Sequence, residues 1–181
     1  MRPRVRARPP KETDMAASAS FDITSTVDLQ EVDNALNQAR KEIAQRYDFK
    51  GSPAAIEFVK ADSTLVLTAE DAFKVGAVWE ILQTRLIRRN VPVKNMDLGE
   101  IEPAAGSTVR QVVTLKQGIE SEAGKAIVKY LKDQGLKKVQ ASIQGDQVRV
   151  TSASKDDLQA AIRTLKAHDF GLELQFGNFR G

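Results

Sequence analysis

The chain of 181 residues contains no cysteine and a single histidine. The missing thiols exclude disulfides, zinc–thiolate sites, iron–sulfur clusters and cysteine nucleophiles. One histidine, His168, cannot form a site that needs two or three imidazoles. No apolar run approaches the roughly 20 residues that a membrane-spanning helix requires. With 41% apolar and 28% charged residues, the chain has an ordinary globular composition, and we expect a cytoplasmic protein without a cofactor.

A catalytic set is missing as well. No nucleophile–base pair or metal-binding cluster stands out in the sequence. The segment 116–118 (KQG) precedes an expected helix, but it lacks the repeated glycines and the Lys-Ser/Thr pair of a phosphate-binding loop. We therefore expect a binding protein and not an enzyme.

The formal net charge of +3 comes from the first fourteen residues, which carry five basic and two acidic side chains and three of the prolines. Such a segment cannot bury a core. We expect residues 1–17 to form a disordered basic extension, either a basic binding arm or an upstream extension of a misassigned start that precedes Met15. The remaining charge divides into −4 over residues 15–107 and +4 over residues 108–181. This division favours a polyanionic partner for the second half, attraction between the halves, or both.

Short β-rich runs alternate with amphipathic helical patterns along the chain. The predicted order is strand, helix, two strands, helix and strand, repeated once, with the boundary at residues 102–107. This order indicates an α+β fold of two tandem ferredoxin-like βαββαβ sandwiches, each a four-stranded antiparallel sheet with two helices on one face. The predicted domains are residues 18–102 and 108–181. Alternatively, the first and last strands of the chain pair across the boundary and not within each domain, so that a strand is exchanged between the two domains.

A hairpin at Gly145-Asp146 determines which side chains share a face. A two-residue turn aligns Gln144 with Gln147 and places Arg149 on the same face, opposite the core. In the usual ferredoxin-like strand order, the strand 109–116 lies beside the strand of Arg149. The open face then carries central cations surrounded by amides, a layout that suits a nucleotide or an RNA backbone.

We assign phosphate contacts to Lys116 and Arg149, supported by Arg110 and Arg180. Gln144 and Gln147 are expected to bond base or sugar groups, and Phe179 to stack on a base. The alternative is an ordinary solvated sheet face.

Three further patterns have plain structural interpretations. Lysines recur at positions 125, 129 and 132 and are interpreted as a solvated helix face that adds to the positive field. The basic residues at 85, 88, 89 and 94 complement a helix C-terminus, or alternatively bind phosphates. Val59 and Val66 make the outer face of the first sheet more apolar, which is consistent with packing against another domain or subunit.

Five segments in register resemble one bacterial family. They are residues 20–23 (SFDI), 46–50 (RYDFK), 115–120 (LKQGIE), 143–150 (IQGDQVRV) and 176–180 (FGNFR). The chain resembles the YajQ family from about residue 18 to its end. The resemblance implies a cytoplasmic protein with two ferredoxin-like domains that binds nucleotides. Some members are described as cyclic di-GMP effectors linked to transcription regulation, and RNA binding has been proposed for the family.

We therefore expect a non-enzymatic nucleotide-binding protein, with a cyclic di-GMP effector in regulation as the leading form. The alternatives are an RNA-binding protein that uses the same face and an adaptor that docks a regulatory protein partner. No membrane partner is expected.

Overall fold

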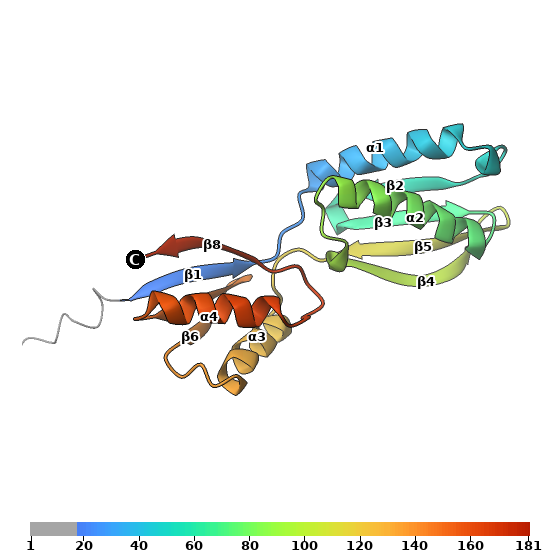
Figure 1. Cartoon of the computed structure of the whole chain (residues 1–181). Coiled ribbons are helices and arrows are strands. Elements are labelled where there is room, and N and C mark those ends of the chain that lie inside the picture. Colours follow the sequence, from blue (N-terminus) through green and yellow to red (C-terminus); the bar gives the residue numbers. More distant parts are fainter. Residues whose placement is uncertain (1–17) are drawn as a thin grey trace, which may run out of the picture. The chain divides into compact units, whose positions relative to one another are not determined.

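The computed structural model in Figure 1 describes residues 18–181. The predicted disordered extension, residues 1–17, lies outside the described residues. The strands are β1 (Ala19–Thr24), β2 (Ala55–Val59), β3 (Thr64–Ala69), β4 (Met96–Ala104), β5 (Thr108–Leu115), β6 (Gln140–Gln144), β7 (Gln147–Ser152) and β8 (Gln175–Arg180). The helices are α1 (Leu29–Gln45), α2 (Ala72–Arg88), α3 (Ser121–Asp133) and α4 (Lys155–Lys166), with short 3₁₀ turns η2 (Tyr47–Phe49), η3 (Lys60–Asp62) and η4 (Val93–Asn95).

The strands form two antiparallel sheets with the orders β6-β7-β1-β8 and β2-β3-β5-β4. The chain divides into two compact units. Unit 1 contains residues 18–24, 118–170 and 174–181 of the described chain, and unit 2 contains residues 25–117 and 171–173. Two helices accompany each sheet, α3 and α4 in unit 1 and α1 and α2 in unit 2. The predicted α+β fold of two ferredoxin-like sandwiches is confirmed.

The units do not follow the predicted ranges 18–102 and 108–181. Strand β1 lies between β7 and β8, and β5 lies between β3 and β4, so each sheet takes one of its two central strands from the other predicted half. The alternative, in which the first and last strands pair across the boundary, is the one observed, because β1 pairs with β8. Unit 1 keeps the βαββαβ order with unit 2 inserted between β1 and α3, whereas unit 2 runs αββαββ. The short β4–β5 connection explains the exchange, because strands joined by a tight turn pair locally. That turn contains Gly106 and Ser107, both at positive φ.

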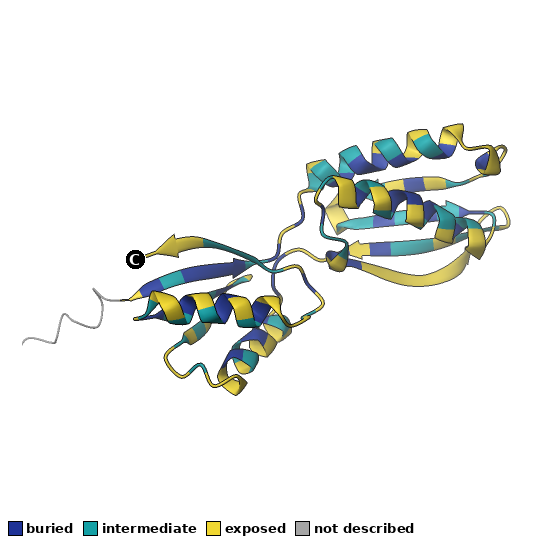
Figure 2. Cartoon of the chain, in the orientation of Figure 1, coloured by how far each residue is buried: buried dark blue, intermediate teal, exposed yellow. Residues whose placement is uncertain are grey.

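Capping and burial explain where the helices begin and which face they bury. The Oδ1 atom of Asp28 accepts hydrogen bonds from the backbone N–H groups at the start of α1, and Asp71 and Ser154 cap α2 and α4 in the same way. Figure 2 shows buried positions recurring along one side of the helices. Both cores consist of fully buried side chains from helices and sheet, which include Leu36, Leu65 and Leu82 in unit 2 and Phe21, Ile23, Ile127 and Leu165 in unit 1. Burial of each such side chain contributes about 1.5–3 kcal/mol.

The segments through which the chain enters and leaves unit 2 lie close together. The buried side chain of Asn95 forms hydrogen bonds with three of these segments. The Nδ2 group of Asn95 donates to Ser25 Oγ (2.9 Å) and to the Lys116 carbonyl (3.1 Å), and its Oδ1 atom accepts from the Glu173 N–H (2.9 Å). The side chain of Gln117 exchanges two hydrogen bonds with the backbone of Val27, at 2.9 and 2.8 Å. A domain inserted into a loop needs its ends close together, and these bonds hold them so.

Two segments of the family resemblance meet at Gly118. The N–H of Ile119 donates to the Asp146 carbonyl at 2.8 Å. Gly118 has a φ of +77°, and a Cβ added there would lie 2.9 Å from the Cβ of Asp146. The glycine is therefore required for two reasons, its left-handed backbone and the close approach of the β6–β7 turn.

We predict that Gly118→Ala destabilises unit 1 more than Gly135→Ala does. Gly135 has nearly the same φ, +76°, but nothing lies within 4 Å of an added Cβ. Both variants incur the left-handed cost of about 1–2 kcal/mol, and only Gly118→Ala adds a clash. Urea unfolding followed by far-UV circular dichroism measures both losses. Equal losses of unfolding free energy in the two variants would show that the close approach of Asp146 does not require a glycine at position 118.

The strand exchange predicts that a fragment of residues 25–117 folds, whereas a fragment of residues 18–102 does not. The first contains all four strands of its sheet, and the second lacks β5, which lies between β3 and β4. The single tryptophan, Trp79, packs against this core. A cooperative thermal transition in tryptophan fluorescence is expected for residues 25–117 only. A cooperative transition of similar midpoint in residues 18–102 would contradict the exchange.

Candidate functional site

The structure divides the predicted nucleotide-binding residues between the units. Arg110, on β5, and Lys116, after it, belong to unit 2, and the other five belong to unit 1. The side chain of Arg110 pairs with Glu102 on β4 at 3.5 Å. The expectation that strand 109–116 lies beside the strand of Arg149 is wrong, because β1 occupies that position.

The register of the β6–β7 hairpin is confirmed. Gln144 lies opposite Gln147, and Ser142 opposite Arg149. Val148 and Val150 are fully buried in the core of unit 1. Because side chains alternate along a strand, Gln144, Gln147 and Arg149 share the other, open face as predicted.

Arg149 is held by a carboxylate that the sequence analysis did not place beside it. Asp22 on β1 lies directly opposite Arg149, and Arg149 Nε donates to Asp22 Oδ1 at 2.9 Å. Asn178 Nδ2 donates to Asp22 Oδ2 at 2.5 Å, and Asp22 is only 5% exposed. This cluster of Asp22, Arg149 and Asn178 links the adjacent strands β7, β1 and β8.

The hydrogen bonds from Arg149 and Asn178 lower the pKa of Asp22, and burial opposes them only in part. Asp22 in turn raises the pKa of Arg149. The buried carboxylate therefore neutralises the cation that was expected to bind phosphate. The cluster is better suited to joining strands than to holding an anion.

The last strand turns Phe179 away from its expected position. The pairing of β1 with β8 shifts between Ser20 and Asp22, and Asn178 has a φ of +53°. One extra residue at such a bulge reverses the alternation of side chains. Phe179 consequently lies 6.0 Å, between ring centroids, from fully buried Phe21, on the edge strand β8, and its own side chain is 60% exposed. The expected stacking residue is thus not on the open face, whereas Arg180, opposite Ser20, is.

The open face of unit 2 carries the apolar residues that were expected there. Val66 lies opposite Val112 on β5, and both valines are half-buried. Val59 occupies the same face at the end of β2. Packing of this face against another domain or subunit stays a prediction.

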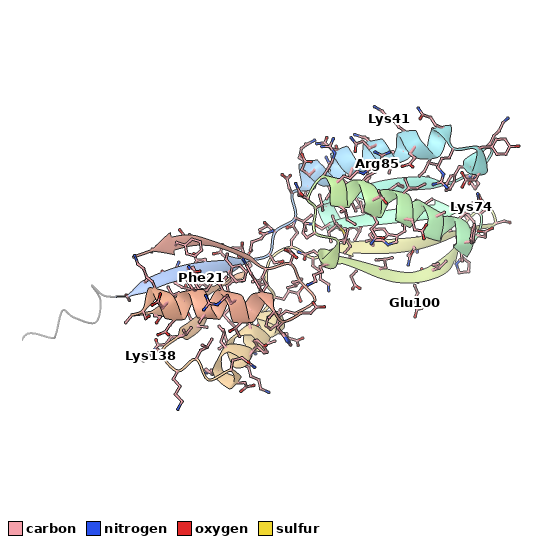
Figure 3. All side chains as sticks on the ribbon, in the orientation of Figure 1. Phe21, Lys41, Lys74, Arg85, Glu100 and Lys138 are labelled. Carbon is pink, nitrogen blue, oxygen red and sulfur yellow. The ribbon has the colours of Figure 1, made fainter. Side chains whose placement is uncertain are left out.

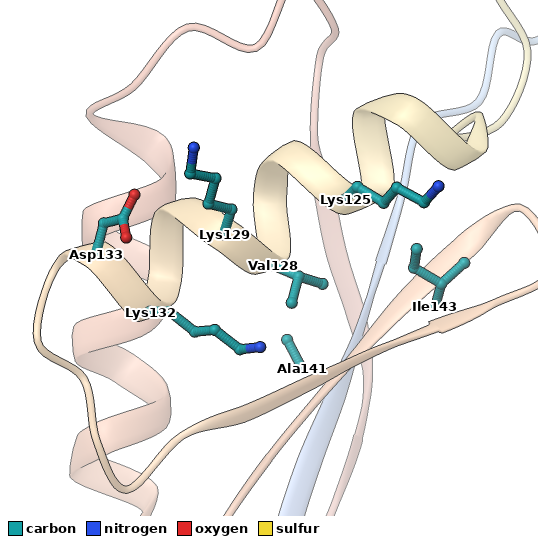
Figure 4. Close-up of a pocket in the computed structure, with 7 residues that line it drawn as sticks. All are labelled: Lys125, Val128, Lys129, Lys132, Asp133, Ala141 and Ile143. Carbon is teal, nitrogen blue, oxygen red and sulfur yellow. The ribbon is translucent and has the colours of Figure 1, made fainter.

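A second surface of unit 1, between α3 and β6, combines cations with an apolar floor. We call it the lysine groove (Figure 4). Its volume is about 390 Å³, and its lining residues are Lys125, Val128, Lys129, Lys132, Asp133, Ala141 and Ile143. Val128 faces Ala141 and Ile143 across the floor, and Lys125 and Lys132 extend beside it, whereas the ammonium group of Lys129 points away from the floor. The floor is accessible because β6 is an edge strand, and Ile143 is 38% exposed.

The local packing explains how α3 comes close to this edge. At Gly124, an added Cβ would lie 3.2 Å from the Cγ1 atom of Ile143. The absence of a side chain at Gly124 therefore allows α3 to approach β6 closely.

The groove is locally positive and its lysines are available. Within residues 18–181, the ammonium groups of Lys125, Lys129 and Lys132 have no hydrogen-bond or ion-pair partner. Asp133 is the single acidic residue in the lining. The described part of unit 1 carries ten basic and eight acidic residues, a formal net charge of +2. Small-ligand sites are typically concave and mostly apolar with a few polar groups, and this groove has that chemistry.

From the sequence alone, these lysines are interpreted as a solvated helix face. The signal was present in their spacing at i, i+4 and i+7, which places them on one side of a helix. The apolar floor beneath them could not be derived, because it depends on the tertiary packing of α3 against an edge strand.

Among residues 18–181, no three His, Cys, Asp or Glu side chains gather as a metal site requires. The described helices include none with the length and apolar character needed to cross a membrane.

The fold and the groove define an α+β protein of two ferredoxin-like units, one of which carries a cationic groove with an apolar floor. Residues 19–180 match the family model described as "Nucleotide-binding protein YajQ-like". The chain therefore belongs to this family, and the predicted resemblance is confirmed.

Relatives in several bacteria carry the name "Nucleotide-binding protein". One from Magnetococcus marinus is 55% identical over 161 residues, which cover 89% of this chain and 98% of the relative. One from Acidithiobacillus ferrooxidans is 52% identical with the same coverage. A third, from Desulfitobacterium hafniense, is 50% identical over 166 residues, or 92% of this chain and the whole relative.

We predict that Asp22→Asn lowers the free energy of unfolding at pH 7, and that the difference from wild type shrinks below about pH 4. The folded-state pKa of Asp22 lies below its unfolded value. Its carboxylate therefore stabilises the fold above the unfolded pKa, and this contribution disappears as the pH falls through the folded pKa. Urea unfolding at pH 7, 5 and 3 measures the difference.

Asp133→Asn is the matched control, because this carboxylate is exposed and has no ion pair among the described residues. A loss for Asp22→Asn that stays constant from pH 7 to pH 3 would contradict a contribution from the ionised carboxylate.

Proposed function

We propose that this protein binds a nucleotide in the lysine groove of unit 1 and does not catalyse a reaction on it. The observation that carries the proposal is that three unpaired lysines line a hollow of about 390 Å³ with an apolar floor. The family description and the names of the relatives, which refer to nucleotides, support the same ligand class.

The two halves of a nucleotide match the two parts of the groove. A base has a flat apolar face that packs on Val128, Ala141 and Ile143, and its phosphates accept charge-assisted hydrogen bonds from the lysines. Lys125 and Lys132 are seven residues apart on α3, or about 10 Å along the helix axis. This span exceeds one phosphoryl group and favours a ligand with two.

Cyclic di-GMP, with two phosphates, is the leading ligand, and the protein would then act as a non-enzymatic effector in regulation. RNA is the alternative, since lysines also neutralise a phosphodiester backbone. No aromatic ring lines the groove, whereas single-strand-binding surfaces usually stack bases on aromatic rings. A small nucleotide is therefore favoured over RNA at this site.

The test is a calorimetric titration of cyclic di-GMP into the full chain at physiological salt, with GTP as a second nucleotide. The triple variant Lys125→Gln, Lys129→Gln, Lys132→Gln is expected to bind at least about 100-fold more weakly, because each hydrogen bond to a charged group contributes about 1.5–3 kcal/mol. Lys41→Gln is the control, since it removes an exposed unpaired lysine from unit 2. Equal affinity in the triple variant and wild type rejects the groove.

The originally predicted face is tested in parallel. Gln147→Ala with Arg180→Gln removes two of its side chains and keeps both partners of the Asp22–Arg149 hydrogen bonds, although it also removes the coulombic interaction of Arg180 with Asp22. Loss of binding in this double variant, with binding retained in the lysine triple variant, would assign the nucleotide to the open face. A steep fall of affinity with salt, together with binding of single-stranded RNA, would support the RNA alternative.

A further inference from the structure

Unit 2 carries a separate polar surface on its helix layer, along the line where α1 and α2 pack together. Two adjoining hollows of about 530 and 370 Å³ lie there and share Gln38 and Arg85. We call them together the arginine groove. Its lining residues are Glu31, Gln38, Lys41, Glu42, Gln45, Arg85, Arg88, Arg89 and Asn90.

Two of the arginines are held in place by carboxylates of the opposite helix. Arg85 Nε and Nη2 donate to Glu42 Oε2 at 3.3 and 3.2 Å, and Arg89 Nη1 donates to Glu31 Oε2 at 2.9 Å. Their side chains are 27% and 30% exposed. Each guanidinium is therefore oriented in advance and retains N–H groups that these bonds do not use.

Two further cations of the groove have no partner. Lys41 on α1 and Arg88 on α2 are exposed, and within residues 18–181 neither forms a hydrogen bond or ion pair through its side chain. Figure 3 labels Lys41 and Arg85 on the two helices. Complementing the C-terminal dipole of α2 accounts for Arg88 and Arg89, but not for Lys41, which lies within α1. Both carboxylates of the groove are already occupied, so the groove mainly presents donors.

We propose that the arginine groove is a docking surface for an acidic segment of a partner protein. The partner's carboxylates would pair with Arg88 and Lys41 and with the free N–H groups of the oriented arginines. From Glu31 to Gln45 the groove extends about 21 Å along α1, the length of a segment and not of a single anion. Every side chain of the lining carries a charged or amide group, so binding is electrostatic, fast and weakened by salt.

The same lining disfavours the other occupants. Glu31 and Glu42 line the hollows, and the C-terminal carbonyls of α2 end beside Arg88 and Arg89. A phosphodiester backbone with a charge at every residue would meet these negative groups, whereas an acidic protein segment can space its carboxylates to avoid them. A second arginine groove would repel the first, so a symmetric contact between copies of this chain is also disfavoured.

The test uses fluorescence anisotropy of a labelled 14-residue helical peptide of alanine and glutamate, with the full chain in low salt. We expect saturable binding that Lys41→Gln with Arg88→Gln weakens at least about tenfold and that added salt weakens further. Lys50→Gln with Lys116→Gln is the matched control, because it removes two exposed, unpaired cations from the same unit outside the groove. Equal weakening by both double variants, or no saturable binding, overturns the proposal.

Charge reversal adds a sharper readout. Arg88→Glu should abolish binding of the acidic peptide, and a peptide with one glutamate changed to lysine should recover part of it. Displacement of the acidic peptide by a 14-nucleotide single strand at lower concentration than by unlabelled peptide would instead assign the groove to nucleic acid. The lysine triple variant of unit 1 should bind the peptide normally, so this proposal and the nucleotide proposal fail separately.

Discussion

The pairing of β1 with β7 is the interaction on which the organisation of the protein depends. It places Phe21 and Ile23 in the core of unit 1 and Asp22 opposite Arg149 on the open face. With β1 in this position, unit 2 becomes an insertion between β1 and α3, and β5 supplies the remaining strand of the other sheet. Asn95 and Gln117 then close the insertion with buried and half-buried hydrogen bonds. A backbone pairing thus decides both the domain boundaries and the charge of a surface.

The exchange also changes which surface of unit 1 is available to an anion. The carboxylate of Asp22 neutralises Arg149, so the open face loses the free central cation that a phosphate would need. The edge position of β6 exposes Ala141 and Ile143 beneath α3, where three lysines have no partner among the described residues. Cations that are already paired stabilise the fold, whereas unpaired cations beside apolar surface are the ones that can bind a ligand.

Much of the local structure could be predicted from the sequence. The two-residue turn at Gly145-Asp146 and the register of Gln144 opposite Gln147 depend on neighbouring residues, and the structure confirms them. The position of Phe179 could not be predicted, because the bulge at Asn178 adds a residue that an alternating pattern does not reveal. The sequence pattern indicated the lysines of the lysine groove by their spacing, but it did not indicate the apolar floor beside them.

The sequence by itself determined the α+β class, the order of the elements, the register of the β6–β7 hairpin and the family, since each follows from periodicity, turn chemistry or matched segments. Tertiary structure alone decided whether β1 or β5 lies beside β7 and which of them lies beside β3, because both strands have the alternation that a central strand requires. Strand partners far apart in sequence are chosen by the total packing of the core and by the connection lengths. For that reason the residue opposite Arg149 on the adjacent strand is Asp22, and not a residue of the strand 109–116, which ends at Lys116.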